Sequence, residues 1–365
     1  MSMDFIEAMN ELEREKGISK DVLFEAIEAA LISSYKRNFN AAQNVRVDMN
    51  RNTGVIKVYA RKLIVEEVLD PRTEISLPAA RELNPHFQLD DVAEQEVTPR
   101  DFGRIAAQTA KQVVTQRIRE AERGLIYNAF IDKEEDIVTG IVQRQDLRNV
   151  YIDLGKIEAV LPLNELMPGE KFKHGERIKA YITKVENTTK GPQILLSRSH
   201  PGLLKRLFEL EVPEIFDGVV EIRSVAREAG FRSKIAVFSR NPEVDPVGSC
   251  VGPRGMRVQT IVNELRGEKI DIVRYSESVE EYVANALSPS KVLEVQVFEA
   301  EKMARVIVPD YQLSLAIGIK GQNARLAAKL TGWKIDIKSE SQAEQEFGRP
   351  KTSSDEMHQD SVSID

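Results

Sequence analysis

The chain contains an internal repeat of about 66 residues, and this repeat limits the possible folds more than any other feature of the sequence. Two G-x-x-G loops begin 66 positions apart, at Gly252 and Gly318. Each loop is followed by apolar residues at helical spacing, then by a glycine (Gly267 or Gly332) and a short strand-like segment. A chain with 20 glycines among 365 residues holds about one G-x-x-G by chance, so the shared surroundings indicate the duplication.

The chemistry of these loops favours contact with phosphate groups. Glycines remove side chains that would keep a phosphodiester backbone away, and the helix that follows offers unpaired N–H groups. This arrangement is typical of a KH module, whose loop holds about four nucleotides of a single strand. A loop that only turns tightly between packed helices would also use glycine. The predicted RNA contacts are Gly252, Pro253, Arg254, Gly255 and Arg257 in the first copy, and Gly318, Ile319, Lys320, Gly321, Gln322, Asn323, Arg325 and Lys329 in the second.

The element order around the loops is the same in both copies. Residues 201–275 and 276–342 each read as a helix, two strands, two helices and a strand, the order of bacterial KH domains. Only residues 275–277 separate the copies, so we expect the two domains to pack as one rigid block.

Residues 132–199 have a different pattern, with five short β-rich segments separated by turn signals. The segments 136–142, 150–154, 158–163, 177–185 and 193–197 predict a small barrel of the S1 (OB) type. Tyr151, Lys184 and Arg198 are predicted RNA contacts, since an aromatic ring can stack on a base and a cation can hold a phosphate. Phe172, His174, Tyr181 and Arg148 could contribute, although aromatic residues on barrel strands are as often part of the core.

The N-terminal residues 1–125 predict an α/β domain with no catalytic pattern. Amphipathic helices are expected at 4–16, 20–37 and 104–130, with Ser19 as a helix cap. A hairpin is expected at 45–59, another strand at 63–68 and a short helix at 76–83. Residues 343–365 are polar and acidic, and we expect this tail to be disordered.

Composition excludes several classes of function. No run of 18 apolar residues occurs and the N-terminus is charged and amphipathic, so a cytoplasmic protein that does not enter a membrane is expected. The single Cys250 permits no intrachain disulfide and no cysteine-rich metal site, and we expect it to be a buried core residue. A net charge of −7, with the acidic excess at the two ends, argues against general coating of nucleic acid and for selective contact with a strand.

The sequence as a whole resembles the NusA family of bacterial transcription elongation and termination factors. The resemblance covers residues 3–342 and is specific in the order of its parts, because KH or S1 domains alone occur in ribosomal proteins and RNA-degrading enzymes. Its motifs are EKGISK at 15–20, LFEAIEAAL at 23–31, VGSCVG at 247–252 and AIGIKGQNARLA at 316–327.

The resemblance implies an α+β multidomain chain: an N-terminal RNA polymerase-binding domain (1–125), an S1 barrel (132–199), two tandem KH domains (201–275 and 276–342) and an acidic tail (343–365). It implies that the first domain docks on RNA polymerase while the S1 and KH domains hold nascent single-stranded RNA. Pausing and intrinsic termination would be promoted, with a part in antitermination alongside other elongation factors. Some family members add acidic repeats after the second KH domain, which the sequence here does not contain. We expect a monomer without cofactors.

Two alternatives remain at this stage. One is an enzyme, since Ala316-x-Gly318-x-x-Gly321 is close to a dinucleotide-binding fingerprint. That fingerprint requires a strand directly before it, where a helix is predicted here, and the four histidines show no metal-ligand spacing. The other alternative is an RNA-binding protein of ribosome assembly or RNA decay that acts without polymerase. Such a protein would not need the N-terminal domain, which a factor that docks on polymerase requires.

Overall fold

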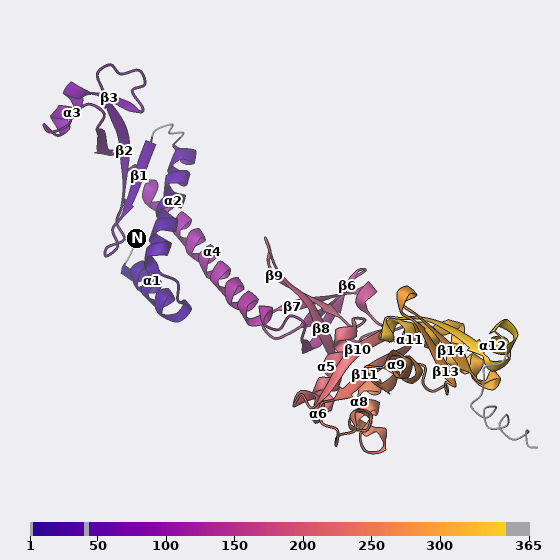
Figure 1. Cartoon of the computed structure of the whole chain (residues 1–365). Helices are drawn as coiled ribbons and strands as arrows, with labels where there is room; N and C mark the ends of the chain where they lie inside the picture. The colour runs from indigo at the N-terminus through magenta and orange to yellow at the C-terminus, as the bar shows by residue number, and fades with distance from the viewer. Residues whose placement is uncertain (1–2, 40–43, 348–365) are drawn as a thin grey trace, which may run out of the picture. The chain divides into compact units, whose positions relative to one another are not determined.

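The computed structural model describes residues 3–39 and 44–347, which form two compact units (Figure 1). Unit 1 runs to Asn128 and includes the short segment Thr189–Pro192, which contains the turn between β8 (Arg177–Thr188) and β9 (Gly191–Ser197). Unit 2 contains the rest, Ala129–Thr188 and the chain from Gln193 onward. The predicted disorder of 348–365 lies outside the described residues.

Unit 1 is built from helices packed on one side of a mixed sheet. Strand β2 (Ile56–Val65) is central and pairs antiparallel with β1 (Asn44–Met49) and β4 (Val92–Glu96), and parallel with β3 (Glu74–Ser76). The helices are α1 (Met3–Lys16), α2 (Lys20–Asn38), α3 (Leu77–Leu83) and α4 (Phe102–Ile131). Apolar residues of α2, β1, β2 and α4 form one core, and their helical and alternating spacing explains why these elements were predictable: Leu23, Ile27, Leu31, Val47, Val58 and Ala106.

Three details of unit 1 differ from the sequence prediction. Residues 63–68 do not form a separate strand, because Leu63–Val65 continue β2. The short strands β3 and β4 were not predicted, since three to five residues give little alternation and their pairing is set by β2. Ser19 does precede α2, but its side chain makes no capping hydrogen bond.

The first part of unit 2 is a closed five-stranded barrel, which confirms the prediction for 132–199. Its strands are β5 (Ile137–Gln145), β6 (Asn149–Asp153), β7 (Glu158–Pro162), β8 (Arg177–Thr188) and β9 (Gly191–Ser197), in the order β5-β6-β7-β9-β8. Alternate residues of the strands fill the interior, among them Val150, Ile152 and Ile182. Gly140 is required inside, because a Cβ atom there would lie 2.4 Å from Cγ2 of Ile152.

The two KH repeats follow with the same topology in each. The first contains α5 (Pro201–Glu211), α6 (Pro213–Phe216), β10 (Val220–Glu228), β11 (Arg232–Ser239), α7 (Pro246–Val251), α8 (Met256–Glu264) and β12 (Lys269–Arg274). The second contains α9 (Val279–Ala286), β13 (Glu294–Phe298), β14 (Met303–Val308), α10 (Leu313–Ile317), α11 (Gln322–Thr331) and β15 (Lys334–Ser339). In each sheet the first two strands are antiparallel and the third lies parallel to the middle one. The predicted duplication is confirmed.

The helix α12 (Glu340–Phe347) corrects the expected start of the tail. Residues 343–347 were assigned to a disordered segment, but they belong to this helix, which packs on β14 and β15. Ala343 is buried, and one apolar contact of this kind is too small to stand out in a polar sequence.

Candidate nucleic-acid interface

The two glycine loops have the same backbone conformation. The first glycines, Gly252 and Gly318, have φ/ψ of 72°/175° and 77°/172°. The third residues, Arg254 and Lys320, lie in the left-handed region at 53°/24° and 54°/29°. A residue with a side chain is held in this region only where its surroundings require it, and such positions are common at binding sites. The repeat inferred from sequence is therefore also a repeat of local geometry.

The two glycines of each loop have different roles. A Cβ atom on Gly252 would lie 2.6 Å from Cγ of Arg257, and one on Gly318 would lie 2.8 Å from the backbone nitrogen of Asn323. The first glycine therefore lets the next helix pack closely, as the simple tight-turn interpretation expects. The last glycine, Gly255 or Gly321, has no atom within 4 Å of such a Cβ position, so the backbone there is open to a ligand.

The loops present their side chains and helix ends to solvent. Pro253, Arg254, Ile319 and Lys320 are exposed, and Ile319 is 85% exposed. Helices α8 and α11 begin directly after the loops, and no side chain caps either of these N-termini. Uncapped N–H groups and the positive end of the helix dipole attract anions. Each loop thus offers an open site for a phosphate beside one cation.

Two predicted contacts serve instead to hold the loops in place. Asn323 is 2% exposed, and its Nδ2 donates to the carbonyl oxygens of Leu287 and Ala316 at 3.1 and 3.0 Å. Its assignment as an RNA contact is wrong, because RNA cannot reach it. Arg257 is partly buried and donates to Glu214 and to the carbonyl oxygen of Ser249. Sequence spacing could not separate these roles, since both residues sit where a phosphate ligand would be expected.

The remaining predicted contacts of the second loop lie at the surface. Arg325 is 49% exposed at its side chain and donates to Glu228, as does the Nε2 of Gln322. Lys329 is exposed one turn further along α11. Glu228 was not identified from the sequence, because it belongs to the first repeat and meets α11 only in the folded chain.

The barrel residues divide into exposed and buried groups. Tyr151 is partly exposed, with its hydroxyl donating to Asp146 and the guanidinium of Arg144 lying 3.5 Å from the ring centroid. Lys184 is exposed and pairs with Glu186. Tyr181 is only 7% exposed and stacks on His200, so it is a core residue. Tyr151 and Lys184 therefore stay available to a strand of RNA.

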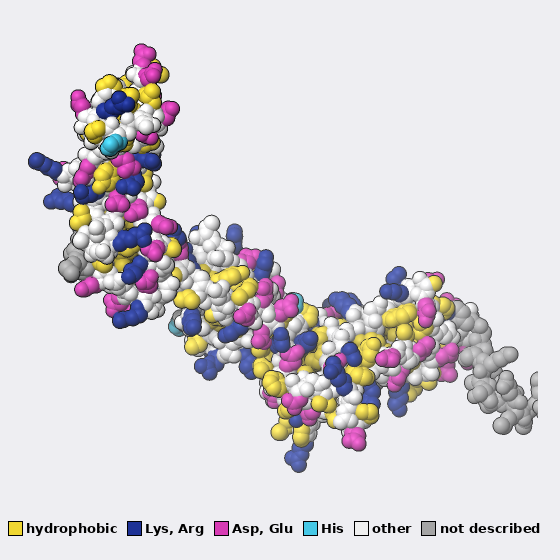
Figure 2. Space-filling model, turned by 60° about the vertical axis from the view of Figure 1, so that its left-hand side comes forward, with side chains coloured by type: hydrophobic (Ala, Val, Ile, Leu, Met, Phe, Trp, Pro, Cys, Tyr) yellow, Lys and Arg dark blue, Asp and Glu magenta, His cyan; other side chains and the backbone are white. Residues whose placement is uncertain are grey.

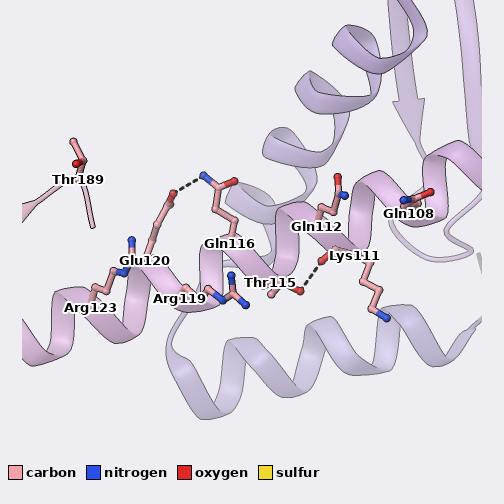
Figure 3. A pocket seen from close by; sticks show the side chains of 9 residues that line it. All are labelled: Gln108, Lys111, Gln112, Thr115, Gln116, Arg119, Glu120, Arg123 and Thr189. Carbon is pink, nitrogen blue, oxygen red and sulfur yellow. Dashed lines mark hydrogen bonds between the residues drawn. The ribbon is translucent and has the colours of Figure 1, made fainter. Parts of the chain in front are cut away.

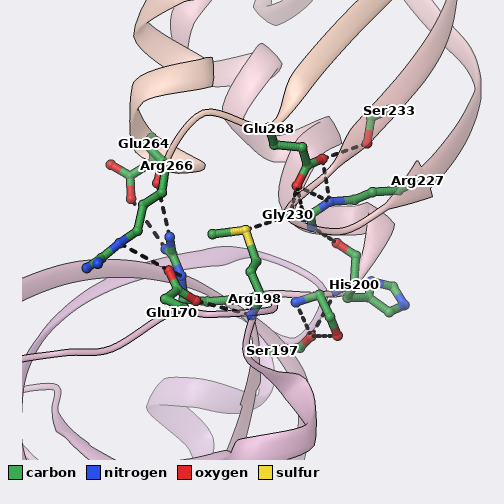
Figure 4. A network of polar contacts seen from close by, with 12 residues as sticks. Glu170, Ser197, Arg198, His200, Arg227, Gly230, Ser233, Glu264, Arg266 and Glu268 are labelled. Carbon is green, nitrogen blue, oxygen red and sulfur yellow. Dashed lines mark hydrogen bonds and ion pairs between the residues drawn. The ribbon is translucent and has the colours of Figure 1, made fainter. Parts of the chain in front are cut away.

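Arg198 is a correction to the predicted site. Its side chain is 1% exposed and donates to Glu170 at 2.8 Å and to the carbonyl oxygens of Lys179 and Glu264 (Figure 4). All these partners belong to the barrel or to α8, so Arg198 joins the barrel to the first KH domain. RNA cannot displace such contacts without opening the domain boundary.

A second buried ion pair supports the same boundary. Arg227 and Glu268 are fully buried at their side chains and pair at 2.9 Å (Figure 4). Arg227 also donates to the carbonyl oxygen of His200, while Glu268 accepts from the backbone nitrogen of Gly230. The ion pair itself lies within the first KH domain, and Arg227 meets the barrel through the sulfur of Met167, 3.4 Å from its Nη2.

The possible metal ligands of the described residues are dispersed, and the one cysteine is buried. Nowhere in residues 3–39 and 44–347 do three His, Cys, Asp or Glu side chains gather as a cation would require. Burial raises the pKa of the Cys250 thiol to about 12, and the fully buried side chain is a core residue, as predicted.

A hollow of about 710 Å³ on unit 1 is lined by polar residues of α4 and by Thr189 (Figure 3).

Charge on the surface is mixed. On the face drawn in Figure 2, Lys and Arg side chains alternate with Asp and Glu side chains and form no single basic field. This distribution fits contact with RNA at particular loops better than general electrostatic attraction of RNA to the whole face.

In the part of the chain that is described, no helix combines the length and the apolar character of a membrane span.

Comparison with known proteins decides the family. Four family models match in order: the NusA N-terminal domain at 4–124, the S1 RNA binding domain at 131–197, the NusA-like first KH domain at 198–275 and the NusA-like second KH domain at 279–345. The transcription termination/antitermination protein NusA of Halalkalibacterium halodurans is 74% identical over 348 residues, covering 95% of this chain and 91% of that protein. The chain belongs to the NusA family.

Other members of the NusA family are similarly close. The transcription termination/antitermination protein NusA of Bacillus subtilis is 70% identical over 343 residues, covering 94% of this chain and 92% of that protein. The solution structure of the N-terminal domain of NusA from B. subtilis is 66% identical, covers 34% of this chain and 99% of that chain, and has a TM-score of 0.32. The NusA domain order confirms the predicted fold class.

Arg198→Ala should destabilise unit 2 strongly. Glu170 would stay buried with only the backbone N–H of Met167 at 3.2 Å and the longer contact to Arg266 at 3.4 Å, so we expect the free energy of unfolding to fall by about 3 kcal/mol. Urea unfolding followed by circular dichroism measures the change. Lys184→Ala is the control and should unfold like the wild type, because its ion pair is exposed. Equal stability of the two variants would contradict the structural role of Arg198.

Proposed function

We propose that this NusA-family protein is a transcription elongation factor that binds RNA polymerase through residues 1–125 and nascent single-stranded RNA through its S1 and KH domains. It promotes pausing and intrinsic termination and takes part in antitermination. It acts by binding, as a monomer, without catalysis. The observation that carries the proposal is the pair of exposed glycine loops with one shared backbone conformation, each opening onto an uncapped helix.

The loops are the proposed centre of RNA binding. Each loop leaves the backbone open at its last glycine and presents one exposed cation, Arg254 or Lys320, to a phosphate, and the exposed Ile319 can contact a base. Exposed apolar side chains also precede the second loop along the chain, at Tyr311 and Leu315. Tyr151 and Lys184 of the barrel extend the proposed surface, whereas Arg198 and Asn323 are excluded by burial.

Unit 1 supplies the proposed link to polymerase. Its match to the NusA N-terminal domain and the name of its relatives support this role over an RNA-binding protein of ribosome assembly or decay. No observation on the chain favours that alternative. By holding polymerase and RNA at once, one molecule raises the effective concentration of RNA at its loops.

Aspartates in both loops should abolish most RNA binding. Replacing Pro253, Arg254, Ile319 and Lys320 by Asp places negative charge where phosphates would lie, and affinity should fall roughly tenfold or more. A control with the same change in charge replaces exposed residues outside the loops: Leu69, Lys205, Leu210 and Lys302 by Asp. Fluorescence anisotropy with labelled single-stranded RNA measures both. Unchanged affinity of the folded loop variant would refute the loop assignment.

The salt dependence of RNA binding should report several phosphate contacts. Each contact contributes about −0.7 to the slope of log affinity against log salt for single strands, so four contacts predict a slope of about −3. The slope is measured by repeating the titration between low and moderate salt. A flat response would mean that the RNA does not lie along the loops.

Polymerase binding should reside in unit 1. In a pull-down with purified RNA polymerase, a fragment of residues 1–128 should retain the enzyme, and a fragment of residues 129–365 should retain much less. The loop variant with four aspartates should bind polymerase like the wild type. If residues 1–128 retain no polymerase, the elongation-factor proposal loses its main support and the alternative gains.

A further inference from the structure

Strand β10 of the first KH domain lies against α11 of the second, the helix that begins at the second glycine loop. Three alternate residues of the strand, Ser224, Ala226 and Glu228, make the contact. Ser224 donates to the carbonyl oxygen of Leu330 at 2.8 Å, and Ala226 is buried in a core formed mostly by the second domain. Glu228 accepts hydrogen bonds from Arg325 and Gln322. Alternate residues of a strand share one face, so a single face of β10 contacts α11 along the length of the helix.

The lengths of the two elements agree. From Gln322 to Leu330 the helix rises about 12 Å, at about 1.5 Å per residue. From Ser224 to Glu228 the strand extends about 13 Å, at about 3.3 Å per residue. Ser224 therefore meets the C-terminal end of α11 while Glu228 meets the N-terminal end, next to the loop. The strand fixes both ends of the helix.

Glu228 makes the contact nearest to the loop. Its oxygens lie 2.6 Å from Nε of Arg325 and 2.8 Å from Nε2 of Gln322. The hydrogen bond from Arg325 is the main reason that the pKa of Glu228 lies below its ordinary value, so the carboxylate is charged at neutral pH. Arg325 also donates to the carbonyl oxygen of Lys320, which connects Glu228 to the loop itself.

Among the described residues, the matching positions of the first repeat make no such contact with another domain. The positions that match Gln322 and Arg325 in the first repeat are Met256 and Gln259. Met256 is 65% exposed, and the side chain of Gln259 bonds to Asn263 within its own helix. The contact through Glu228 is thus particular to the second loop, and it ties that loop to the first domain.

We propose that Glu228 is a positioning residue that sets the second glycine loop in register with the first, so that one RNA strand engages both loops. The proposal rests on the function proposed above. A different role is conceivable from the same contacts: the carboxylate could compete with RNA phosphates for Arg325. The two roles predict opposite signs, because removing a competitor raises affinity and removing a positioning contact lowers it.

The experiment compares two lengths of labelled single-stranded RNA of random sequence. One has about five nucleotides and covers a single loop, and the other has about twelve, enough for two loops at four nucleotides each with a spacer. The full chain is tested as wild type, Glu228→Ala and Glu228→Gln. Glu221→Ala is the matched control, since Glu221 lies on the same strand, is equally exposed and pairs with Arg223 and Arg240 of its own domain.

Positioning predicts a loss that depends on RNA length. Glu228→Ala should weaken binding of the long RNA roughly five- to tenfold, through lower effective concentration at the second loop, and change the short RNA less than twofold. Glu228→Gln should fall between Glu228→Ala and the wild type, because a neutral acceptor keeps part of the contact. Glu221→Ala should match the wild type.

Three results for the variants would overturn the positioning role alone. Tighter binding of both RNAs by both Glu228 variants would identify a competing charge, and an equal loss for both lengths would identify a defect of one loop. Unchanged affinities would show that the contact of Glu228 with Arg325 has no effect on RNA binding. A wild-type protein that binds neither RNA would instead overturn the proposed function, and the positioning role with it. Thermal unfolding of each variant confirms that it is folded.

Discussion

The apolar core shared by the two KH domains is the constraint on which the interface depends. Ala226 and Ala236 of the first domain are buried in one cluster with Val283, Val306 and Leu326 of the second. Neither domain can shift against the other without exposing these residues to water, which costs roughly 25 cal/mol for each Å² of apolar surface. The helices of the second loop pack in this shared core, and those of the first loop pack in the adjoining core of the first domain, so the separation of the two loops is a property of the folded pair.

Charged groups at the domain boundaries help to fix the relative orientation of the barrel and the two KH domains. Arg198 with Glu170, and Arg227 with Glu268, are buried where the barrel meets the first KH domain. Lys234 is fully buried between the KH domains, where it pairs with Asp271 and donates to the carbonyl oxygen of Ser288. Buried charges contribute little net stability, but a shifted arrangement would leave them without partners. They therefore favour one arrangement of the barrel and the two KH domains.

Much of the architecture could be predicted because it follows from local patterns. Alternation of apolar and polar residues predicted the barrel strands, apolar residues at helical spacing predicted α2 and α4, and the repeated loops predicted the KH domains. The failures have a common origin in partners that are distant in sequence. Strands β3 and β4 exist because β2 pairs with them, and α12 is held by β14 and β15. Arg198 and Asn323 looked like ligands by residue type, and only their burial excludes them.

The sequence by itself determined the repeat, the backbone chemistry of the loops and the family, because glycine placement and periodicity are local properties. Tertiary structure decided which polar side chains are free to meet RNA and how the second loop is attached to the first domain. The contact of Glu228 with Arg325 joins residues 97 positions apart. No local pattern encodes such a contact, since it forms only when the packing of α11 on β10 brings the two side chains together.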